Sequence, residues 1–466
     1  MLNPIVIGND TICALATPHG MGAIAIVRVS GPKAIDIVSS LFQQNGKSLE
    51  MSQIDSHKAY HGHLINNKEL LDEVVVTFFK APHSFTGEDT AEISVHGSVF
   101  IQQKLLEVLI DNGCRMAEAG EFTRRAFVNR KFDLAQAEAI ADLIQSENEA
   151  SHRVAINQLK GGFSEELQTM RSKLLEMTSL MELELDFSEE DVEFADRSQL
   201  KVLLQEALDK INKLKDSFRL GNAIKNGIPV AIVGQTNTGK STLLNALLGE
   251  DRAIVSDIAG TTRDTIEETL NIDGTMFRFI DTAGIRETDE TIEKIGIERT
   301  FRKISEAQIV IGMIDGTLPS LEIKAAAEAI TSKVNILKQK LLLLINKKDL
   351  MEDDKIYHIR NLMHIDYISA KNTEDVEDLK KNIGRMGRLP ELDAQSVLVT
   401  NVRHYEALLH ASESLQAVKV GLETNIPTDL VSQDLRQALH YLGSITGEIT
   451  TDEVLGTIFS RFCIGK

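Results

Sequence analysis

One stretch constrains the fold of this chain more than any other: residues 234–241 read GQTNTGKS. The stretch follows the apolar run 230–233 and precedes the helix-like run 242–247, so the motif G-x-x-x-x-G-K-S has the strand–loop–helix context that it requires. Its glycines let backbone N–H groups turn toward phosphates, and the start of the helix adds positive potential. The sequence therefore predicts a phosphate-binding loop in an α/β domain with a doubly wound sheet.

Two side chains of this loop predict its chemistry. Lys240 can reach the β- and γ-phosphates, which makes it a candidate catalytic residue, and the hydroxyl of Ser241 can bind Mg²⁺. The residues of the loop that we expect to contact the nucleotide are Gly234, Asn237, Thr238, Gly239, Lys240, Ser241 and Thr242.

Three later stretches predict a guanine nucleotide. They read DTAG at 281–284, NKKD at 346–349 and SAK at 369–371, and the first two follow strand-like runs. Asp281 can hold Mg²⁺ through water, and the N–H of Gly284 can sense the γ-phosphate. Asp349 can accept the N1 and N2 protons of guanine, so a buried Asp349 would reject adenine. The residues assigned to the nucleotide here are Asp281, Thr282, Ala283, Gly284, Asn346, Lys347, Asp349, Ser369, Ala370 and Lys371. Together the motifs predict a GTP-hydrolysing enzyme.

The segment 256–264, SDIAGTTRD, lies between the phosphate-binding loop and DTAG, where a switch is expected. Thr262 is predicted to supply the second Mg²⁺ hydroxyl and to take part in catalysis, and Ser256 and Thr261 to contact the nucleotide. Ile285 follows DTAG where many small GTPases carry a glutamine that orients water. Another group must therefore orient the attacking water.

The residues themselves leave two roles in hydrolysis open. The water-orienting candidates are the acidic residues that follow DTAG, namely Glu287, Asp289, Glu290 and Glu293. The transition-state charge could be neutralised by Arg263, by Arg286, or by a monovalent cation held by the amide oxygen of Asn237. An arginine finger is worth about 10³–10⁵ in rate, and K⁺ in that place could act similarly.

Composition limits the class of protein and its compartment. The chain has 466 residues, a formal net charge of −19 and three cysteines. The widely spaced cysteines predict a reducing compartment, and the lack of a leader-like N-terminus or a ~20-residue apolar run predicts a cytoplasmic protein. With this charge, an RNA substrate would need a partner or a local basic patch for its phosphates.

The pattern of the chain changes along its length. Residues 1–125 alternate strand-like runs, such as 24–29 and 73–79, with glycine turns, which predicts a small α/β domain. Residues 126–222 and 388–466 are helical; apolar residues at 200, 204, 208, 211, 214 and 218 line one helix face. We expect the α/β domain at 223–387 to be inserted into an all-helical one.

Several short stretches of the chain resemble one family. They are DTI at 10–12, ATP at 16–18, IVRVSG at 26–31, SFTGED at 84–89, GEFT at 120–123, DLAQAEA at 133–139, DIAGTTRD at 257–264 and FCIGK at 462–466. Over essentially its full length, the chain resembles the MnmE (TrmE) family of tRNA-modification GTPases. The resemblance implies an N-terminal folate-binding α/β domain, a helical domain and an inserted Ras-like G domain.

The resemblance also implies functional residues. A K⁺ site would be formed by Asn237, Ser256, Ile258 and Thr261, and Glu293 would orient the attacking water. A folate site would map onto Arg28, Glu92, Lys131 and Lys466. Cys463 would act in the modification chemistry, either as a nucleophile or in orientation alone.

The resemblance further implies partners and a reaction. The protein would be a homodimer through its N-terminal domains and would pair its G domains in the presence of K⁺. With the flavoprotein MnmG (GidA), which would supply much of the tRNA contact, it would add an aminomethyl-type group to carbon 5 of the wobble uridine of certain tRNAs. The donor would be 5-formyl- or 5,10-methylene-tetrahydrofolate. The alternatives are a ribosome-assembly or regulatory GTPase without a folate site and, with far less support, a membrane transporter with a G domain.

Overall fold

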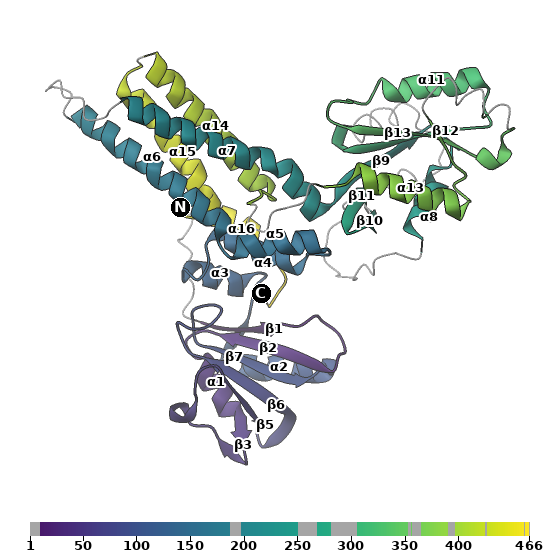
Figure 1. The fold of residues 1–466 in the computed structure, drawn as a ribbon. Coiled ribbons are helices and arrows are strands. Elements are labelled where there is room, and N and C mark those ends of the chain that lie inside the picture. Colours follow the sequence, from purple (N-terminus) through teal and green to yellow (C-terminus); the bar gives the residue numbers. More distant parts are fainter. Residues whose placement is uncertain are drawn as a thin grey trace. The chain divides into compact units, whose positions relative to one another are not determined.

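The computed structural model describes residues 10–186, 197–249, 268–280, 305–352, 356, 365–389, 397–424, 426–460 and 462–465. The chain divides into two compact units. The first contains Met1–Gln145, Ala155–Asn212 and Glu406–Lys466, and the second contains Ser146–Val154 and Lys213–Tyr405. Figure 1 labels the helices and strands of both units.

The first unit begins with an eight-stranded sheet in the order β4-β3-β5-β6-β7-β2-β1-β8. Its strands are β1 (Thr11–Leu15), β2 (Ile24–Ser30), β3 (Phe42–Gln44), β4 (Lys47–Ser48), β5 (Lys58–Asn66), β6 (Glu69–Phe79), β7 (Thr90–His96) and β8 (Cys114–Met116), with a short 3₁₀ turn η1 at Met51–Gln53. The strand pairs are antiparallel except for β1 with β8.

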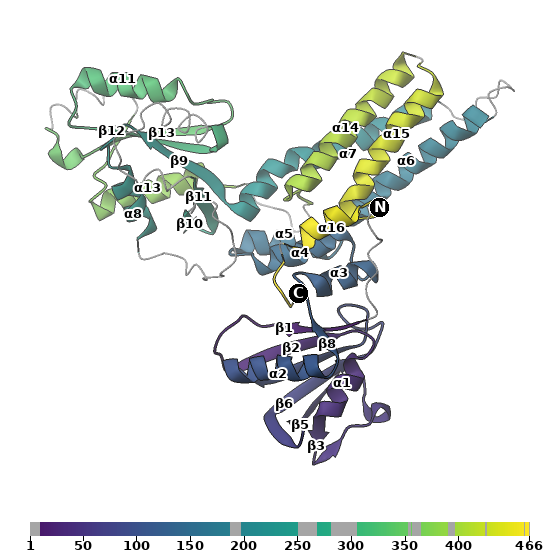
Figure 2. The same cartoon turned by 180° about the vertical axis from the view of Figure 1, so that it is seen from behind.

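The two faces of this sheet are covered differently. Figure 2 shows α1 (Ala34–Leu41) and α2 (Val99–Asp111) on one face of the sheet. There the two helices complete an apolar core with residues such as Val27, Val76 and Ile93. On the other face, Phe122 of α3 (Glu121–Val128) packs against Ile12 and Ala14. Along β2, the buried residues Ala25, Val27 and Val29 alternate with less buried ones, which is the period of two of a β-strand.

The rest of the first unit is helical. Its helices are α4 (Leu134–Ile144), α5 (Glu149–Leu159), α6 (Gly162–Asp186), α7 (Arg197–Asn226), α14 (Val402–Glu423), α15 (Thr428–Thr446) and α16 (Asp452–Phe459); parts of α5, α7 and α14 belong to the second unit. Residues before and after the inserted segment pack together: α6 contacts α15, and Gln205 of α7 accepts a hydrogen bond from Lys419 of α14 at 2.9 Å. The predicted apolar positions 200, 204, 208, 211 and 214 of α7 are buried.

The second unit contains a six-stranded sheet in the order β10-β11-β9-β12-β13-β14. Its strands are β9 (Ile228–Gly234), β10 (Glu268–Ile272), β11 (Thr275–Phe279), β12 (Ile309–Asp315), β13 (Lys340–Asn346) and β14 (Asp366–Tyr367). The other helices formed by its described residues are α8 (Lys240–Leu248), α11 (Ser320–Thr331), α13 (Thr373–Met386) and the short turn η3 (Lys348–Leu350). The strands β11, β9, β12, β13 and β14 are parallel to their neighbours, and only β10 is antiparallel.

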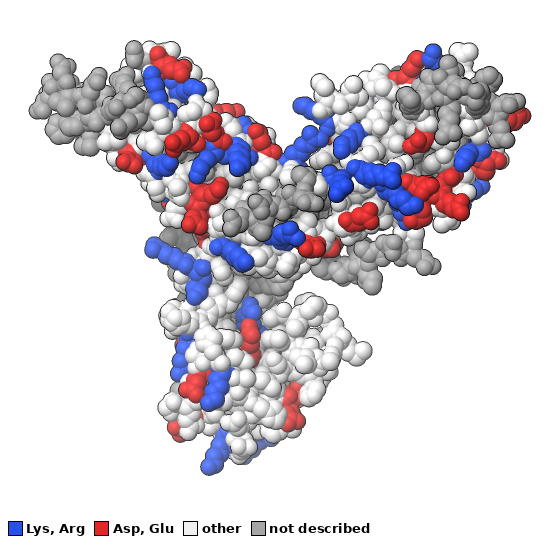
Figure 3. Space-filling model, in the orientation of Figure 1, with Lys and Arg blue, Asp and Glu red and all other residues white. Residues whose placement is uncertain are grey.

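Helices lie on both faces of this second sheet. Residues of α8 and α13 pack on one face with Val230 and Ile232, and residues next to α11 pack on the other face with Val233 and Val310. Figure 3 shows Lys and Arg gathered near the end of α13 and acidic residues near its start, which matches the helix dipole. The predicted fold class, an α/β part, a helical part and a P-loop domain with a doubly wound sheet, is thereby confirmed.

Among the helices formed by the described residues, none has both the length and the apolar character that a membrane crossing requires.

Candidate functional site

The phosphate-binding loop joins β9 to α8, as predicted. Two of its residues, Asn237 with φ +62° and Gly239 with φ +95°, adopt left-handed backbone conformations, which asparagine and glycine tolerate best. At Gly239 there is also no room for a side chain, because a Cβ would lie 2.3 Å from the Nδ2 of Asn346. The glycine thus lets the loop turn against the neighbouring strand end and begin α8.

Side chains of the loop fix its shape. The buried hydroxyl of Thr238 donates to the carbonyl of Gln235 at 2.9 Å. The Nζ of Lys240 folds back over the loop and donates to the carbonyls of Gly234 at 3.0 Å and Gln235 at 2.7 Å. The ammonium group therefore lies on the loop itself, where phosphate oxygens would offer stronger, charged acceptors.

Asn346 links three of the predicted motifs and is only 3% exposed. Its Nδ2 donates to the carbonyl of Thr238 at 2.8 Å, and its Oδ1 accepts the N–H of Ala370 at 2.9 Å. The phosphate-binding loop, the NKKD turn and the SAK loop are thus tied to one buried amide. Ser369, at the start of the SAK loop, is held in addition by its N–H, which donates to Asp375 at 2.7 Å; Lys371 is exposed.

Lys347 and Asp349 lie on the turn that follows β13. The Nζ of Lys347 forms an ion pair with Asp315 at 2.6 Å. Burial opposes ionisation of Asp315, but hydrogen bonds from Lys347 and Thr317 hold its pKa below the usual value. Asp349 is exposed, whereas the argument from sequence required a buried carboxylate. That part of the prediction is corrected: discrimination between bases requires the bound base itself to cover Asp349.

Asp315 is a residue of this site that the sequence reasoning missed. It ends β12 at the same edge of the sheet where Asn346 ends β13, and the two residues are partners in the strand register. A polar residue directly after the apolar run 309–314 was the available signal, because the carboxyl ends of parallel strands meet at one edge.

Other predicted residues lie outside the described part of the chain. They are Ser256, Ile258, Thr261, Thr262, Arg263, Asp281, Thr282, Ala283, Gly284, Arg286, Glu287, Asp289, Glu290, Glu293 and Lys466. The described strand β11 runs parallel to β9 and ends at Phe279. Because Ile280 then donates its N–H to the carbonyl of Val230 at 3.0 Å, β11 leads toward the edge that carries the phosphate-binding loop.

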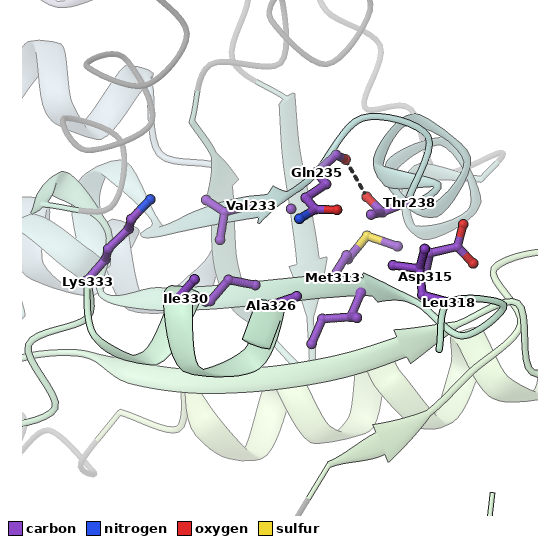
Figure 4. Close-up of a pocket in the computed structure, with 12 residues that line it drawn as sticks. Val233, Gln235, Thr238, Met313, Asp315, Leu318, Ala326, Ile330 and Lys333 are labelled. Carbon is purple, nitrogen blue, oxygen red and sulfur yellow. Dashed lines mark hydrogen bonds between the residues drawn. The ribbon is translucent and has the colours of Figure 1, made fainter. Parts of the chain in front are cut away.

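A cavity of about 280 Å³ lies beside the phosphate-binding loop, between the ends of β9 and β12 and the helix α11. Figure 4 shows Thr238 and Met313 on one side and Ala326 and Ile330 of α11 on another. The wall is mainly apolar, and among the described residues that line it the ionisable ones are Asp315 and Lys333. The cavity lacks the array of donors that a triphosphate needs, so we do not assign the nucleotide to it.

In the first unit, Arg28 and Glu92 face each other from paired positions of β2 and β7. The Nε of Arg28 donates to Glu92 at 2.9 Å, and the guanidinium lies 5.1 Å from the ring centre of Phe85 and 5.7 Å from that of Phe122. The two predicted folate residues are thus brought together as a half-buried ion pair between aromatic rings. Lys131 is exposed and donates to the carbonyl of Pro82 at 3.0 Å, close to the same loop as Phe85.

The C-terminal segment reaches the same part of the sheet. Ile464 forms an antiparallel bridge with Ala119, and the N–H of Gly120 donates to the carbonyl of Cys463 at 3.4 Å. Gly465 has φ +97°, and a Cβ there would lie 2.1 Å from the carbonyl oxygen of Leu15. Cys463 itself is exposed, whereas Cys13 and Cys114 are buried. The backbone is therefore fixed on both sides of an exposed thiol.

The tail lies close to Arg28 in the fold. Leu15, which Gly465 touches, follows the residue that pairs with Arg28 in the register of β1 and β2. Phe122, whose ring faces Arg28, comes two residues after Gly120, where a Cβ would meet the carbonyl of Phe459 at 2.7 Å. The structure thus gathers Arg28, Glu92 and Cys463 around the start of α3.

A buried charge cluster supports this start of α3. Arg125 is 1% exposed and forms ion pairs with Asp10 at 2.8 Å, Glu121 at 2.9 Å and Glu88 at 3.3 Å. Arg115 adds contacts of 2.7 Å to both Asp10 and Glu121. Although burial works in the opposite direction, the two arginines hold the pKa values of Asp10 and Glu121 below their usual range. The cluster therefore fixes α3 on the sheet.

Comparisons with known proteins cover nearly the whole chain. Residues 11–131 match the family model of the GTP-binding protein TrmE N-terminus, and residues 134–463 match that of the MnmE helical domain. The chain is 52% identical to the tRNA modification GTPase MnmE of Flavobacterium johnsoniae, over 99% of this chain and 100% of that protein. It is 51% identical to the protein of the same name from Bacteroides thetaiotaomicron, over 98% and 100%. Among solved structures, Aquifex aeolicus Era is 28% identical over 40% of this chain and 66% of that one, with a TM-score of 0.26.

Proposed function

This chain belongs to the MnmE family of tRNA modification GTPases, and from that premise we propose the following function. The protein hydrolyses GTP and, with the flavoprotein MnmG, installs a 5-(carboxymethyl)aminomethyl-type group on the wobble uridine of certain tRNAs. The one-carbon unit comes from a tetrahydrofolate derivative. The protein works in the cytoplasm, as a homodimer through its N-terminal domains.

For GTP binding, the chain supplies a loop already held in shape. The N–H groups of residues 234–241 surround the β- and γ-phosphates, and the Nζ of Lys240 exchanges the carbonyls of Gly234 and Gln235 for phosphate oxygens. Ser241 lies in the first turn of α8, so its hydroxyl fits Mg²⁺, which neutralises phosphate charge when bound. Asn346 keeps the base-binding turns in register with this loop.

For hydrolysis, we assign the orientation of water to Glu293, and the neutralisation of transition-state charge to K⁺ held by Asn237, Ser256, Ile258 and Thr261. Of these residues, only Asn237 belongs to the described part of the chain. Its left-handed backbone, with φ +62°, turns the loop at this position. Asparagine adopts this backbone conformation readily, so it suits this position of the loop.

For the modification step, the proposal rests on the backbone contacts that hold the C-terminal tail, residues 462–465, in place. An exposed thiol, at Cys463, is held by backbone contacts beside the Arg28–Glu92 pair. A GTPase that acts only as a switch has no use for such an arrangement. The flat rings of Phe85 and Phe122 suit the face of a pterin, and the carboxylate of Glu92 suits its amino-amide edge.

The structure changes the expected role of Arg28 within this proposal. Because its guanidinium is already held by Glu92 and two aromatic rings, we assign it to the orientation of Glu92. The carboxylates of a folate glutamate tail then fall to Lys131, which is exposed, and to Lys466. The one-carbon group would be held on the side of Cys463.

The test is mass spectrometry of tRNA nucleosides from cells that lack the gene, complemented with plasmid copies. The copies encode the unchanged protein, Lys240→Ala, Cys463→Ala and, as a control, Ser460→Ala, which alters an exposed residue three positions before Cys463. We expect 5-aminomethyl-type uridines to vanish on deletion. The unchanged protein and the control should restore them, and Lys240→Ala and Cys463→Ala should not.

An unchanged nucleoside profile after deletion would refute the modification role and leave the regulatory GTPase. Restoration by Cys463→Ala would refute only the role of the thiol. Calorimetric titration with 5-formyl-tetrahydrofolate distinguishes the modification enzyme from a regulatory GTPase in vitro. Only a chain with a folate site should release heat of binding, and Glu92→Gln should abolish it.

A further inference from the structure

A second hollow, of about 900 Å³, lies in the second unit, away from the GTP motifs. Its walls are residues 215–219 of α7, residues 305–308 that precede β12, residues 333–339 between α11 and β13, and Tyr405. Both β12 and β13 begin at this hollow. The GTP motifs follow the other, carboxyl ends of the same parallel strands. The hollow therefore lies at the opposite edge of the sheet and is not part of the GTP site.

Hydrogen bonds and ring stacking hold these walls together. Arg219 donates to the carbonyl of Lys338 at 2.7 Å, and Gln339 donates to the carbonyl of Ala307 at 2.8 Å. The rings of Phe218 and Tyr405 stack with centres 4.6 Å apart and planes at 22°. These contacts join the segments that line the hollow to one another.

The lining is richer in cations than the rest of the chain. The described residues of the lining include four basic and two acidic side chains, whereas the whole chain has 50 Lys and Arg against 69 Asp and Glu. The basic residues are Lys215, Arg219, Lys333 and Lys338, and the acidic ones are Asp216 and Glu306. A protein of net charge −19 that handles RNA needs such a local reversal of sign, because phosphates are bound by cations.

Cations beside stacked aromatic rings form the combination that single-stranded nucleic acids bind. We propose that this hollow binds a nucleotide of an RNA strand, with its phosphates at Arg219 and Lys338 and its base against the Phe218–Tyr405 stack. The proposal rests on the proposed function only in naming tRNA as the RNA. A free mononucleotide has the same phosphate and base as a nucleotide of RNA, so the experiment must distinguish RNA binding from mononucleotide binding.

The test compares tRNA binding by two charge-removal variants of the full chain. One is Arg219→Ala with Lys338→Ala at the hollow. The matched control is Lys201→Ala with Lys210→Ala, which removes two exposed lysines of the same helix α7 that do not line the hollow. Binding is measured by fluorescence anisotropy of labelled tRNA at several KCl concentrations, and GTP hydrolysis without RNA is measured as a check of folding.

We expect the hollow variant to bind tRNA at least ~10-fold more weakly, and its slope of log K against log salt to fall by roughly 1.4–1.8, for two lost phosphate contacts. The control should stay within about twofold, and hydrolysis without RNA should be unchanged in both. Tyr405→Leu should weaken binding about 5- to 100-fold without a change in slope, because it removes stacking and no charge.

Equal affinity and slope in the hollow variant and the control would overturn the proposal, as would a lack of tRNA binding by the unchanged protein in 50 mM KCl. Uridine monophosphate, which the guanine site should reject, tests whether the hollow binds a free mononucleotide instead. If it binds the unchanged protein with the same dependence on Arg219 while tRNA does not bind, the hollow serves a mononucleotide and the RNA assignment is wrong. These results are independent of the nucleoside profile, which alone decides the proposed function.

Discussion

Replacing Arg125 with methionine removes the cation at the centre of the buried charge cluster. Methionine has a similar length, so we expect little cost from a cavity. The cost comes instead mainly from Glu121, which is 2% exposed and loses a partner, whereas Asp10 (38% exposed) and Glu88 (18% exposed) remain in reach of water. Losing one partner of a buried ion pair costs about 3–5 kcal/mol. Because Arg115 still contacts Asp10 and Glu121 at 2.7 Å, we expect the lower end, about 3 kcal/mol.

Native-state hydrogen exchange is the suitable assay, because the chain has no tryptophan and exchange reports on each region separately. A loss of about 3 kcal/mol corresponds to roughly a 100-fold fall in protection. The fall should be confined to peptides from β1, α3 and the rest of the first unit. Peptides from β9 and β12 in the second unit should keep the protection of the unchanged protein.

The effect should also depend on pH in a fixed direction. The folded-state pKa values of Asp10 and Glu121 lie below their unfolded values. Their contribution to stability is therefore complete above the unfolded values, near pH 4, and is lost as the pH falls through the folded values. The difference between the unchanged protein and Arg125→Met should be full at pH 7 and should shrink below about pH 4.

Arg153→Met is the matched control. Arg153 also pairs with a glutamate four residues earlier on a helix, Glu149 at 2.8 Å, but both side chains are exposed. Such a pair is worth only about 0.3–0.5 kcal/mol. If Arg125→Met lowered protection no more than Arg153→Met, or if its effect were the same at pH 3 and pH 7, the argument from buried charge would be refuted.

Three further predictions concern function. GTP hydrolysis should be faster in KCl than in NaCl at equal ionic strength, and equal rates would rule out the cation site at Asn237. Asp349→Asn should shift binding from guanosine toward xanthosine nucleotides, because the amide reverses one donor–acceptor pair; unchanged guanine preference in a competition assay would contradict the role given to Asp349. Gly465→Ala should abolish wobble-uridine modification and leave GTP hydrolysis intact, because a Cβ at this position strikes Leu15. Gly456→Ala, where a Cβ meets open space, is its control, and equal modification by both variants would show that the seat of the tail does not matter.

Sequence predicts best what is decided locally. The strands at 230–233 and 341–345 follow from runs of apolar residues, and the phosphate-binding loop follows from its glycines. The structure places both strands within a few residues of these bounds. The burial of residues 200–214 on one face of α7 follows from their spacing alone.

Contacts between distant positions were not predictable. Arg28 and Glu92 were assigned separately to a ligand, because nothing local shows that β2 and β7 are paired in a register that makes them partners. Arg125 looks like an ordinary surface charge on a helix, yet it is buried because its partners come from positions 10 and 88. The exposure of Asp349 likewise depends on how the turn after β13 lies on the domain.

The seat of the tail has a consequence for the order of folding. The residues that receive the tail, Leu15 and Ala119, leave the ribosome more than 300 positions before Ile464. Domains made early fold first, so the sheet and α3 form before residues 462–465 have been synthesised. A chain whose translation stops after the G domain would contain the whole nucleotide site but could not place Cys463. The segment that positions Cys463 is thus made only after the segment that hydrolyses GTP.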